Sequence, residues 1–493
     1  MLAAGTARVA PAQGYLLRFD SRVQAASYRG VMLDSVPAAD TVTGPTGGTA
    51  TSDGYAVTCV PGSAYCTFFR PGPEVSAAPA TLVADLSVWG LGIPGLSLRA
   101  SARAGTTFAD PWPGTEPALQ LLEGYAQYAT ARFTAQLGRQ TVASRLGTTG
   151  FDGGTITLRA AGRRLELRGY GGWALWRGSV LPVTSPALNP LDDYRPPERT
   201  VLGGASAAWS SSRCDVTVLY QREVDPSVSY FATEQAGATA VVRIVSGLSL
   251  SGGADYNIAE GLWGNAEATL GYSARTGRIN ATATVRRYRP FFDLWTIWGA
   301  FSPVPYTAVG GSLSVTPIRR LLVRADGEHY AFANTETATP LVNVEDSGWR
   351  FSWDATYTVT PMFALEGGYQ SEFGPGASSR GFNGSVTYTK GDHLALGVQA
   401  SSLDRPLELR FDESSLVTYG AFARYAPRPR LRIELDADQY VEDRTRPDAA
   451  AFDWNQLRVS ARVVFALASR EELRNLPPAV RQMPEGPKGG TAR

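Results

Sequence analysis

Hydrophobic and polar residues alternate along most of the chain, with the period of two that is typical of a β-strand with two different faces. Between Trp349 and Val359 every second residue is apolar or aromatic, and the residues between them are polar or charged. From Leu431 to Asp438 apolar residues alternate with charged ones in the same way. No run of about 18 apolar residues interrupts the pattern, so no transmembrane helix is predicted. The chain is therefore predicted to be all-β.

Two further features favour a membrane barrel over a soluble sandwich. Trp and Tyr often stand on the apolar phase near a strand end, as in the aromatic girdle of a membrane barrel. Tight turns, such as Ala161–Arg163 and Lys390–Asp392, alternate with long polar loops, such as 177–198 and 334–346. Short periplasmic turns and long outer loops are typical of outer-membrane proteins. The pattern predicts an antiparallel up-and-down transmembrane β-barrel in the bacterial outer membrane, in contact with its lipid.

The alternation divides the chain into about 22 strands, with 18 or 20 as alternatives, because a bacterial single-chain barrel needs an even number. The barrel is expected to span residues 13–467, with residues 27–79 as its longest outer loop. Residues 1–12 contain a small-x-small sequence and are expected to be the remnant of a signal peptide, with an ordinary Ala-rich tail as the alternative. Residues 468–493 are rich in Pro and Gly and are expected to form a polar periplasmic tail.

Charge is balanced, with a formal net charge of +1, so nothing indicates a nucleic-acid partner. Among the 46 basic residues only Lys390 and Lys488 are lysines. This bias fits a GC-rich genome. It also fits a polar lumen, because the planar guanidinium binds carboxylates and phosphates in a bidentate manner.

The phase of the strands places a set of arginines in the lumen. They are Arg18, Arg22, Arg99, Arg103, Arg164, Arg168, Arg324, Arg350, Arg430, Arg432, Arg458 and Arg462. The carboxylates that share this phase are Asp20, Glu166, Asp326, Asp354, Glu434, Asp436 and Asp438. Because arginines outnumber carboxylates in this count, a weak anion preference is predicted, which salt screens over about 10 Å at 0.1 M. The most secure lumenal cations are those whose strand face carries no carboxylate, namely Arg99, Arg103, Arg458 and Arg462.

The cysteines and histidines indicate structure and not catalysis. Cys59 and Cys66 flank a short loop and are predicted to form a disulfide in an oxidising compartment. Cys214 is expected to be a small strand side chain. The only histidines, His329 and His393, lie near no nucleophile motif and no converging metal ligands. No enzymatic activity, metal or cofactor is predicted.

One aromatic segment, residues 286–301, has two interpretations. Its aromatic rings beside arginines could stack on sugar rings or bind an anionic polymer. Alternatively, the segment forms part of an interfacial girdle or a loop folded into the barrel mouth.

Within residues 119–175 a tyrosine-bearing strand leads into a Gly-Arg-Gln strand end and a Phe-Asp-Gly return. The residues of this pattern are Gly138, Arg139, Gln140, Phe151, Asp152 and Gly153. In this pattern the segment resembles the alginate-export family of outer-membrane barrels. The resemblance implies passage of an anionic polysaccharide or of small solutes.

The same residues also have a structural interpretation. Gly138 would permit close approach of two strands, and Asp152-Gly153 would form a turn. Strict alternation places Arg139 on the lipid phase, where a charge is costly. A bulge or a strand end is therefore expected at Arg139.

These observations predict an outer-membrane channel, a porin or export pore, for anionic or sugar-like solutes or polysaccharide. The alternative is a structural sheath or anchor for a periplasmic partner, such as an export or electron-transfer component. Conductance of the purified barrel distinguishes the two.

Overall fold

The computed structural model describes residues 14–43, 48–55, 57–110, 118–175, 200–224, 232–289, 305–333, 347–374, 377–404, 413–446 and 454–469. Nearly all of these residues lie in strands. Within the described ranges the helical elements are two single turns, η1 (Ala38–Asp40) and η2 (Ala161–Arg163). No helix among the described residues is long and apolar enough to cross a membrane.

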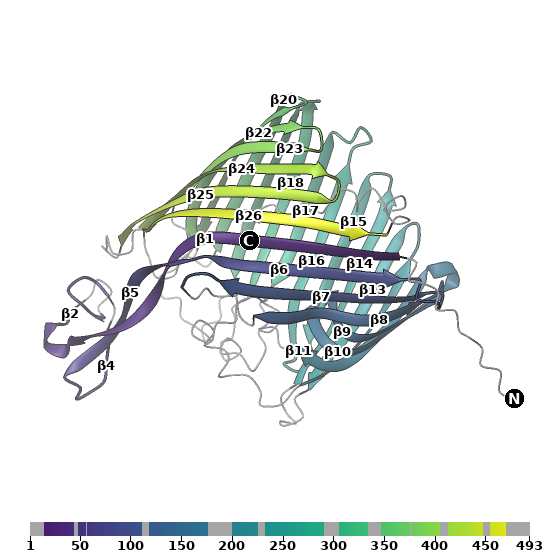
Figure 1. Ribbon diagram of the computed structural model, residues 1–493, viewed down its shortest axis with the longest axis horizontal. Helices are drawn as coiled ribbons and strands as arrows, with labels where there is room; N and C mark the ends of the chain where they lie inside the picture. The colour runs from purple at the N-terminus through teal and green to yellow at the C-terminus, as the bar shows by residue number, and fades with distance from the viewer. Residues whose placement is uncertain are drawn as a thin grey trace.

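The strands of the wall pair in sequence order, each antiparallel to the next (Figure 1). They are β1 (Gly14–Pro37), β6 (Pro79–Trp89), β7 (Leu96–Thr107), β8 (Leu119–Ala129), β9 (Phe133–Ser144), β10 (Gly147–Ala160), β11 (Leu165–Leu175), β12 (Val201–Ser210), β13 (Cys214–Val224), β14 (Ala232–Val245), β15 (Leu248–Asn257), β16 (Leu262–Ser273), β17 (Ile279–Tyr288), β18 (Tyr306–Ile318), β19 (Leu321–Phe332), β20 (Ser347–Thr360), β21 (Phe363–Gly374), β22 (Ala377–Lys390), β23 (Leu394–Asp404), β24 (Glu413–Arg428), β25 (Leu431–Arg446) and β26 (Trp454–Ala468).

The sheet closes on itself through β1. Its first half pairs with β26 on one side, from Leu16 opposite Ala468, and with β6 on the other, from Gly14 opposite Trp89. The result is a closed antiparallel barrel of 22 strands, which confirms the predicted fold and its preferred strand number. Closure pairs the backbone donors and acceptors of both terminal strands, as lipid requires.

Both ends of the wall, Gly14 and Ala468, lie at the end of the barrel that carries the tight turns. The long loops 177–198 and 334–346 expected at the opposite end lie outside the described residues, apart from the strand ends that flank them. So do residues 1–12, residues 470–493 and most of the aromatic segment 286–301.

Residues 27–79 were expected to form a long outer loop, but the described residues of this range are folded largely into strands. The second half of β1 pairs with β5 (Tyr65–Ala77), and the two strands project beyond the barrel rim as a long arm (Figure 1, left). The short strands β2 (Val42–Thr43), β3 (Thr49–Ala50) and β4 (Thr58–Cys59) complete the arm. Outside the membrane a strand has no lipid face, so it lacks the alternation by which the other strands were recognised.

The arm has a small interior of its own. Cys59 and Cys66 are joined by a disulfide between β4 and β5. The Tyr55 and Phe68 rings lie 5.6 Å apart, and Cys66 is fully buried. Burial raises the pKa of the Tyr55 phenol. The arm is thus a packed substructure and not an irregular loop.

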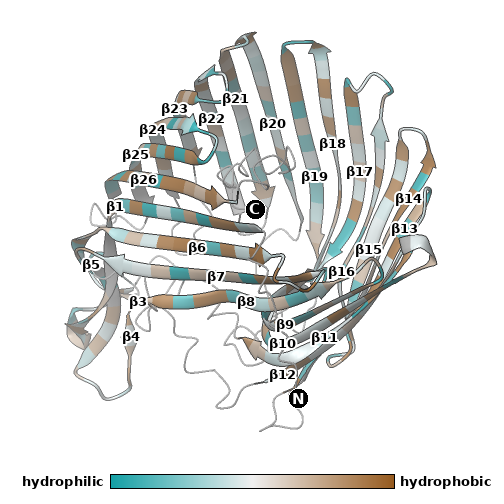
Figure 2. Cartoon of the chain, turned by 45° about the vertical axis from the view of Figure 1, so that its right-hand side comes forward, coloured by the Kyte–Doolittle hydropathy of each residue, from teal (hydrophilic) through white to brown (hydrophobic). Residues whose placement is uncertain are grey.

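Hydrophobic and hydrophilic residues alternate along the strands of the wall (Figure 2), so each strand has one face toward lipid and one toward the lumen. Trp353 in the middle of β20 is 47% exposed on the outer surface, whereas Gln456 on the lumenal face of β26 is 2% exposed. We call these two sides of a strand its lipid face and its lumenal face. An exposed apolar band around a closed barrel is the surface that a membrane covers.

Candidate functional site

A belt of alternating charges crosses the lumenal face from β16 to β21. It consists of Glu267, Arg286, Glu328, Arg350 and Glu372. Arg286 Nη2 donates to Glu328 Oε1 at 2.6 Å, and Arg350 Nη2 lies 3.2 Å from Glu372 Oε1. The guanidinium of Arg350 also lies 3.7 Å from Glu328, so each inner charge has opposite neighbours on both sides.

A glycine lets the belt cross β18. Gly310 stands opposite Glu328 in the register, and a Cβ at this position would come within 3.0 Å of the Glu328 Cβ. The absence of a side chain lets Arg286 on β17 reach over β18 to Glu328 on β19. A larger residue would separate the two halves of the belt.

Tyrosines hold the arginines of the belt in place. The Arg350 guanidinium carbon lies 4.6 Å from the centre of the Tyr330 ring, and Arg286 lies 5.7 Å from the Tyr306 ring. The Tyr330 hydroxyl donates to Glu372 Oε1 at 3.0 Å. Because Tyr330 is buried, its ring serves the wall and is not available for stacking on a solute.

A second charged network joins the strands at the barrel closure. Arg462 on β26 donates to Asp20 on β1 through Nε at 2.7 Å and lies 3.2 Å from Glu434 on β25. Arg432 and Arg18 each lie 3.3 Å from one of these carboxylates, Arg432 from Glu434 and Arg18 from Asp20. We call Arg432, Glu434, Arg462, Asp20 and Arg18 the closure network.

Several of the predicted lumenal arginines lie outside these two groups. Arg99 lies 3.3 Å from Glu123, and Arg458 donates to Gln456 at 2.7 Å while lying 4.8 Å from the Tyr440 ring centre. Arg103 is buried. The strand register places three further arginines on the lumenal face, namely Arg22, Arg168 and Arg324.

Two arginines predicted for the lumenal wall lie elsewhere. Arg164 belongs to the turn between β10 and β11, and Arg430 to the turn between β24 and β25. Both positions continue the alternation of the adjacent strand by one residue, which is why they were counted with it. Each of the two arginines lies one residue before its strand begins, in a turn where the chain reverses direction.

The sequence count missed most of the carboxylates that partner the arginines. It considered carboxylates that alternate with an arginine on its own strand, whereas Glu123, Glu328 and Glu372 reach arginines from neighbouring strands. The register, which decides these pairs, is not visible in one strand. The wall therefore carries paired charges of both signs and not a simple excess of arginines.

The motif residues around Arg139 form a structural joint on the lipid face. Arg139 donates to both carboxylate oxygens of Asp152 at 2.7 and 2.9 Å and to the Leu121 carbonyl at 2.9 Å. Their phase is that of Leu137, which is 72% exposed. A charge-assisted bidentate pair lowers the cost of both charges there.

This arrangement corrects two expectations. The register between β9 and β10 runs through Arg139 opposite Asp152 without a bulge or strand end. Asp152 and Gly153 lie within β10 and do not form a turn. Gly153 is needed instead for close packing, because a Cβ would come within 2.1 Å of the Gly171 carbonyl. Gly138, with φ +131°, meets the Gly124 carbonyl in the same way.

The lumenal side of the same joint is apolar. Phe151 is fully buried, and its ring centre lies 5.7 Å from that of Tyr170. Val142, Ala174 and Leu202 complete this cluster. Gln140 closes it by donating to the Gly153 carbonyl at 2.9 Å.

Above this joint the β9–β10 hairpin enters the lumen. Its turn residue Arg145 lies 3.3 Å from Asp255 on β15 and donates to Glu267 Oε2 on β16 at 2.9 Å. Both carboxylates are on the lumenal face, several strands away around the wall. The hairpin tip therefore crosses the interior in front of β11 to β14.

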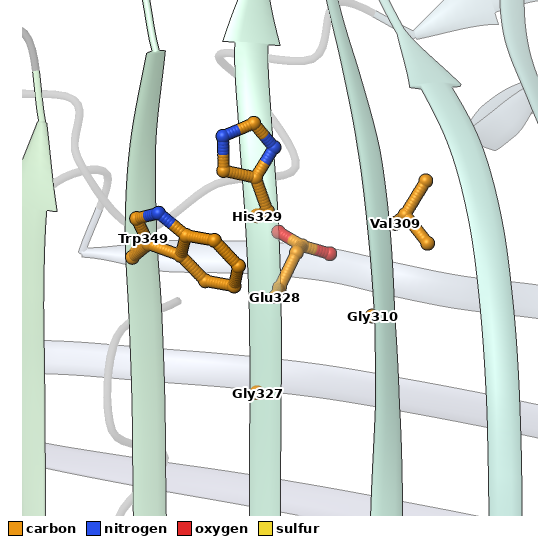
Figure 3. Close-up of a pocket in the computed structure, with 6 residues that line it drawn as sticks. All are labelled: Val309, Gly310, Gly327, Glu328, His329 and Trp349. Carbon is orange, nitrogen blue, oxygen red and sulfur yellow. The ribbon is translucent and has the colours of Figure 1, made fainter.

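A shallow apolar hollow of about 590 Å³ lies on the opposite, lipid-facing side of β18 to β20 (Figure 3). His329 and Trp349 stand side by side there, with ring centres 4.6 Å apart, and Val309 faces them. Gly327, on the same strand as His329, also lines the hollow. The hollow faces the membrane and is not part of the lumen. Within the described residues no group of three His, Cys, Asp or Glu side chains could hold a metal ion.

No protein-family model matches the chain, and no curated protein is significantly similar to it. Solved barrels with low sequence identity are similar to it. The outer membrane protein OprD of Pseudomonas aeruginosa is 9% identical over 94% of this chain and 96% of its own, with a TM-score of 0.37. A BenF-like porin of Pseudomonas fluorescens Pf-5 is 10% identical over 93% and 98%, with a TM-score of 0.39. The FrpB iron transporter of Neisseria meningitidis is 10% identical over 92% and 82%, with a TM-score of 0.44.

The barrel's own geometry determines its place in the cell. An even number of antiparallel strands closes without an edge, an apolar band faces outward, and charged side chains face inward. This combination is found in the outer membrane of Gram-negative bacteria. The chain is an integral outer-membrane β-barrel.

Proposed function

We propose that this barrel is an outer-membrane channel for sugar-like or anionic solutes. The observation that carries the proposal is the charged lumenal wall of a closed 22-stranded barrel. A barrel of this circumference is too wide for wall side chains alone to fill, so its interior holds water or a plug. Paired guanidiniums and carboxylates along a wetted wall suit the passage of polar molecules.

The pairing of charges favours hydroxyl-rich solutes. A sugar hydroxyl both donates and accepts, so it can bind an arginine and a neighbouring carboxylate of the belt at the same time. Because most of the arginines have carboxylate neighbours, their field is largely compensated over a few ångströms. We expect the anion preference predicted from the sequence to be weak and to be strongest at low salt.

The resemblance of residues 119–175 suggests a larger cargo, an anionic polysaccharide. Its motif residues serve the joint between β8, β9 and β10, so the resemblance supports a related barrel architecture more directly than a related cargo. If such a polymer is the cargo, addition of alginate to one side of a bilayer should block the open channel transiently.

Swelling of proteoliposomes tests the proposal. Vesicles containing the folded barrel should swell in an isosmotic sugar solution, faster with a monosaccharide than with a trisaccharide. A sugar acid of equal size should enter at a similar or slightly higher rate. Folding is checked independently by the heat-dependent shift of the barrel on a gel. A folded barrel that admits no monosaccharide would contradict the proposal and favour the sheath.

A further inference from the structure

We propose that the tip of the β9–β10 hairpin, residues 143–149, is a movable constriction of the pore and that Arg145 is the latch that holds it against the wall. The inference rests on the proposed channel function, because a constriction regulates flow only where solutes pass. It gives a role to Arg145, whose ion pairs with Asp255 and Glu267 are explained neither by the strand alternation nor by the belt.

The latch is a set of long-range contacts made by one side chain. Arg145 donates to both carboxylate oxygens of Glu267 and to the Asn265 carbonyl at 3.0 Å, and its Nε lies 3.3 Å from Asp255. The side chain is 12% exposed. A guanidinium placed in this way among two carboxylates and a carbonyl is held firmly for as long as all three stay in place.

The tip is free of the wall on its own side. Pairing between β8 and β9 ends at Gly124 opposite Arg139, whereas β9 and β10 continue together to Ser144 opposite Gly147. Because β10 stays paired with β11 up to Gly150 opposite Leu175, only the residues between Gly150 and the turn form a two-stranded ribbon with β9. An isolated two-stranded hairpin is only marginally stable in water. Its position therefore depends on what it touches across the lumen.

The other contacts of the tip are few. Thr149 exchanges hydrogen bonds of 3.2 and 3.4 Å with Gln221 on β13. Leu146 packs over Gly237 on β14, where its side chain lies 3.2 Å from the position that a Cβ would occupy. These contacts fit a docked state, and the contacts of Arg145 provide its only ion pairs among the described residues of the tip.

The base of the hairpin is fixed, which confines the movement to the tip. Arg139 binds Asp152 and the Leu121 carbonyl on the lipid side. Phe151 is buried with Leu202 on the lumenal side. A rigid base and a tip whose ion pairs come from one side chain define an element with two positions, docked and released.

The latch borders a hollow, which makes release feasible. A polar hollow of about 230 Å³ lies beside it, lined by Arg145, Asp255, Glu267 and Arg286 among others. Water or a polar solute that enters this hollow can take over the hydrogen bonds of Arg145 one at a time. The released tip would widen the passage in front of β11 to β14.

Two readouts test the latch. The first is single-channel conductance of Arg145→Gln, with Arg243→Gln as the matched control, since Arg243 forms an ion pair with Asp215 far from the tip. The second is the rate at which a membrane-impermeant maleimide labels Leu146→Cys, in a Cys214→Ser background. This rate requires no conduction, because Leu146 is buried in the docked tip and should become accessible when the tip is released.

We expect Arg145→Gln to raise the conductance and to increase the labelling of Leu146→Cys about tenfold, which corresponds to about 1.4 kcal/mol. Arg243→Gln should leave both unchanged. Equal labelling with and without Arg145, in barrels that pass the gel test for folding, would overturn the latch. Faster labelling in a barrel that never conducts would support the latch as a structural device and overturn the channel function instead.

Discussion

Residues one position apart on a strand of this barrel have opposite surroundings. Trp353 contacts the membrane, while Ser352 faces the lumen and stands opposite Asp326 in the register. The alternation in the sequence is sufficient to predict this difference, because the strand period is two. It is not sufficient to predict which lumenal charges pair, because that depends on the register between strands.

Trp353→Arg should lower the free energy of unfolding by roughly 2–4 kcal/mol, since it places a charge near the middle of the lipid face. Ser352→Arg should change it little, because the new side chain enters the charged lumen. Urea titration of the barrel in lipid vesicles measures both. Similar effects of the two substitutions would show that the assignment of the two faces is wrong.

The Arg139–Asp152 pair offers a second test at the residue scale. Both side chains are partly exposed on the lipid face, at 25% and 30%. Arg139→Ala deprives Asp152 of its cation and should cost about 2–3 kcal/mol, less than the loss of a fully buried partner. Arg139→Ala with Asp152→Ala together should cost less than the sum of the two single changes. Additive single effects would mean that the pair contributes no coupling.

Strands and hairpins differ in how well the sequence predicts them. Wall strands are recognisable because each has a lipid face. The arm and the tip of the β9–β10 hairpin are not, because both leave the membrane wall and meet water or protein on both faces. The alternation in the sequence therefore predicts most of the wall, but it predicts neither the arm nor the inward-turned hairpin tip.

The disulfide of the arm should be present in the mature protein. Mass spectrometry of peptides from the unreduced protein should find Cys59 linked to Cys66. Replacement of both by Ser should make the arm more sensitive to protease without changing the gel shift of the barrel, because the arm packs on its own interior. Two free thiols at these positions would contradict this part of the account.

Loss of an arginine from the closure network should destabilise the barrel more than loss of an exposed lumenal arginine. Arg462→Ser leaves Asp20 and Glu434 without their shared cation and should cost about 2 kcal/mol, below the cost of breaking a fully buried pair. Arg99→Ser should cost at most about 1 kcal/mol, because Arg99 is 52% exposed. Urea midpoints of the two variants give the comparison. A greater loss of stability for Arg99→Ser than for Arg462→Ser would show that the closure network does not have this stabilising role.

At the scale of the whole molecule, the even strand number and the closure can be predicted from a physical requirement alone. Lipid leaves no backbone group unpaired, so the first and last strands must meet. What passes through the barrel does not follow in this way. It depends on cross-strand charge pairs and on the hairpin tip, which depend on contacts between residues far apart in the chain.

Single-channel recording of the purified barrel in a planar lipid bilayer tests the central claim most directly. We expect stepwise conductance in barrels that pass the gel test, with a small reversal potential on the anion side in a salt gradient. Replacing by Ser the four arginines predicted as the most secure lumenal cations, Arg99, Arg103, Arg458 and Arg462, should move that potential toward cations. Folded barrels that insert and carry no current at any applied voltage would show that the barrel is not a channel.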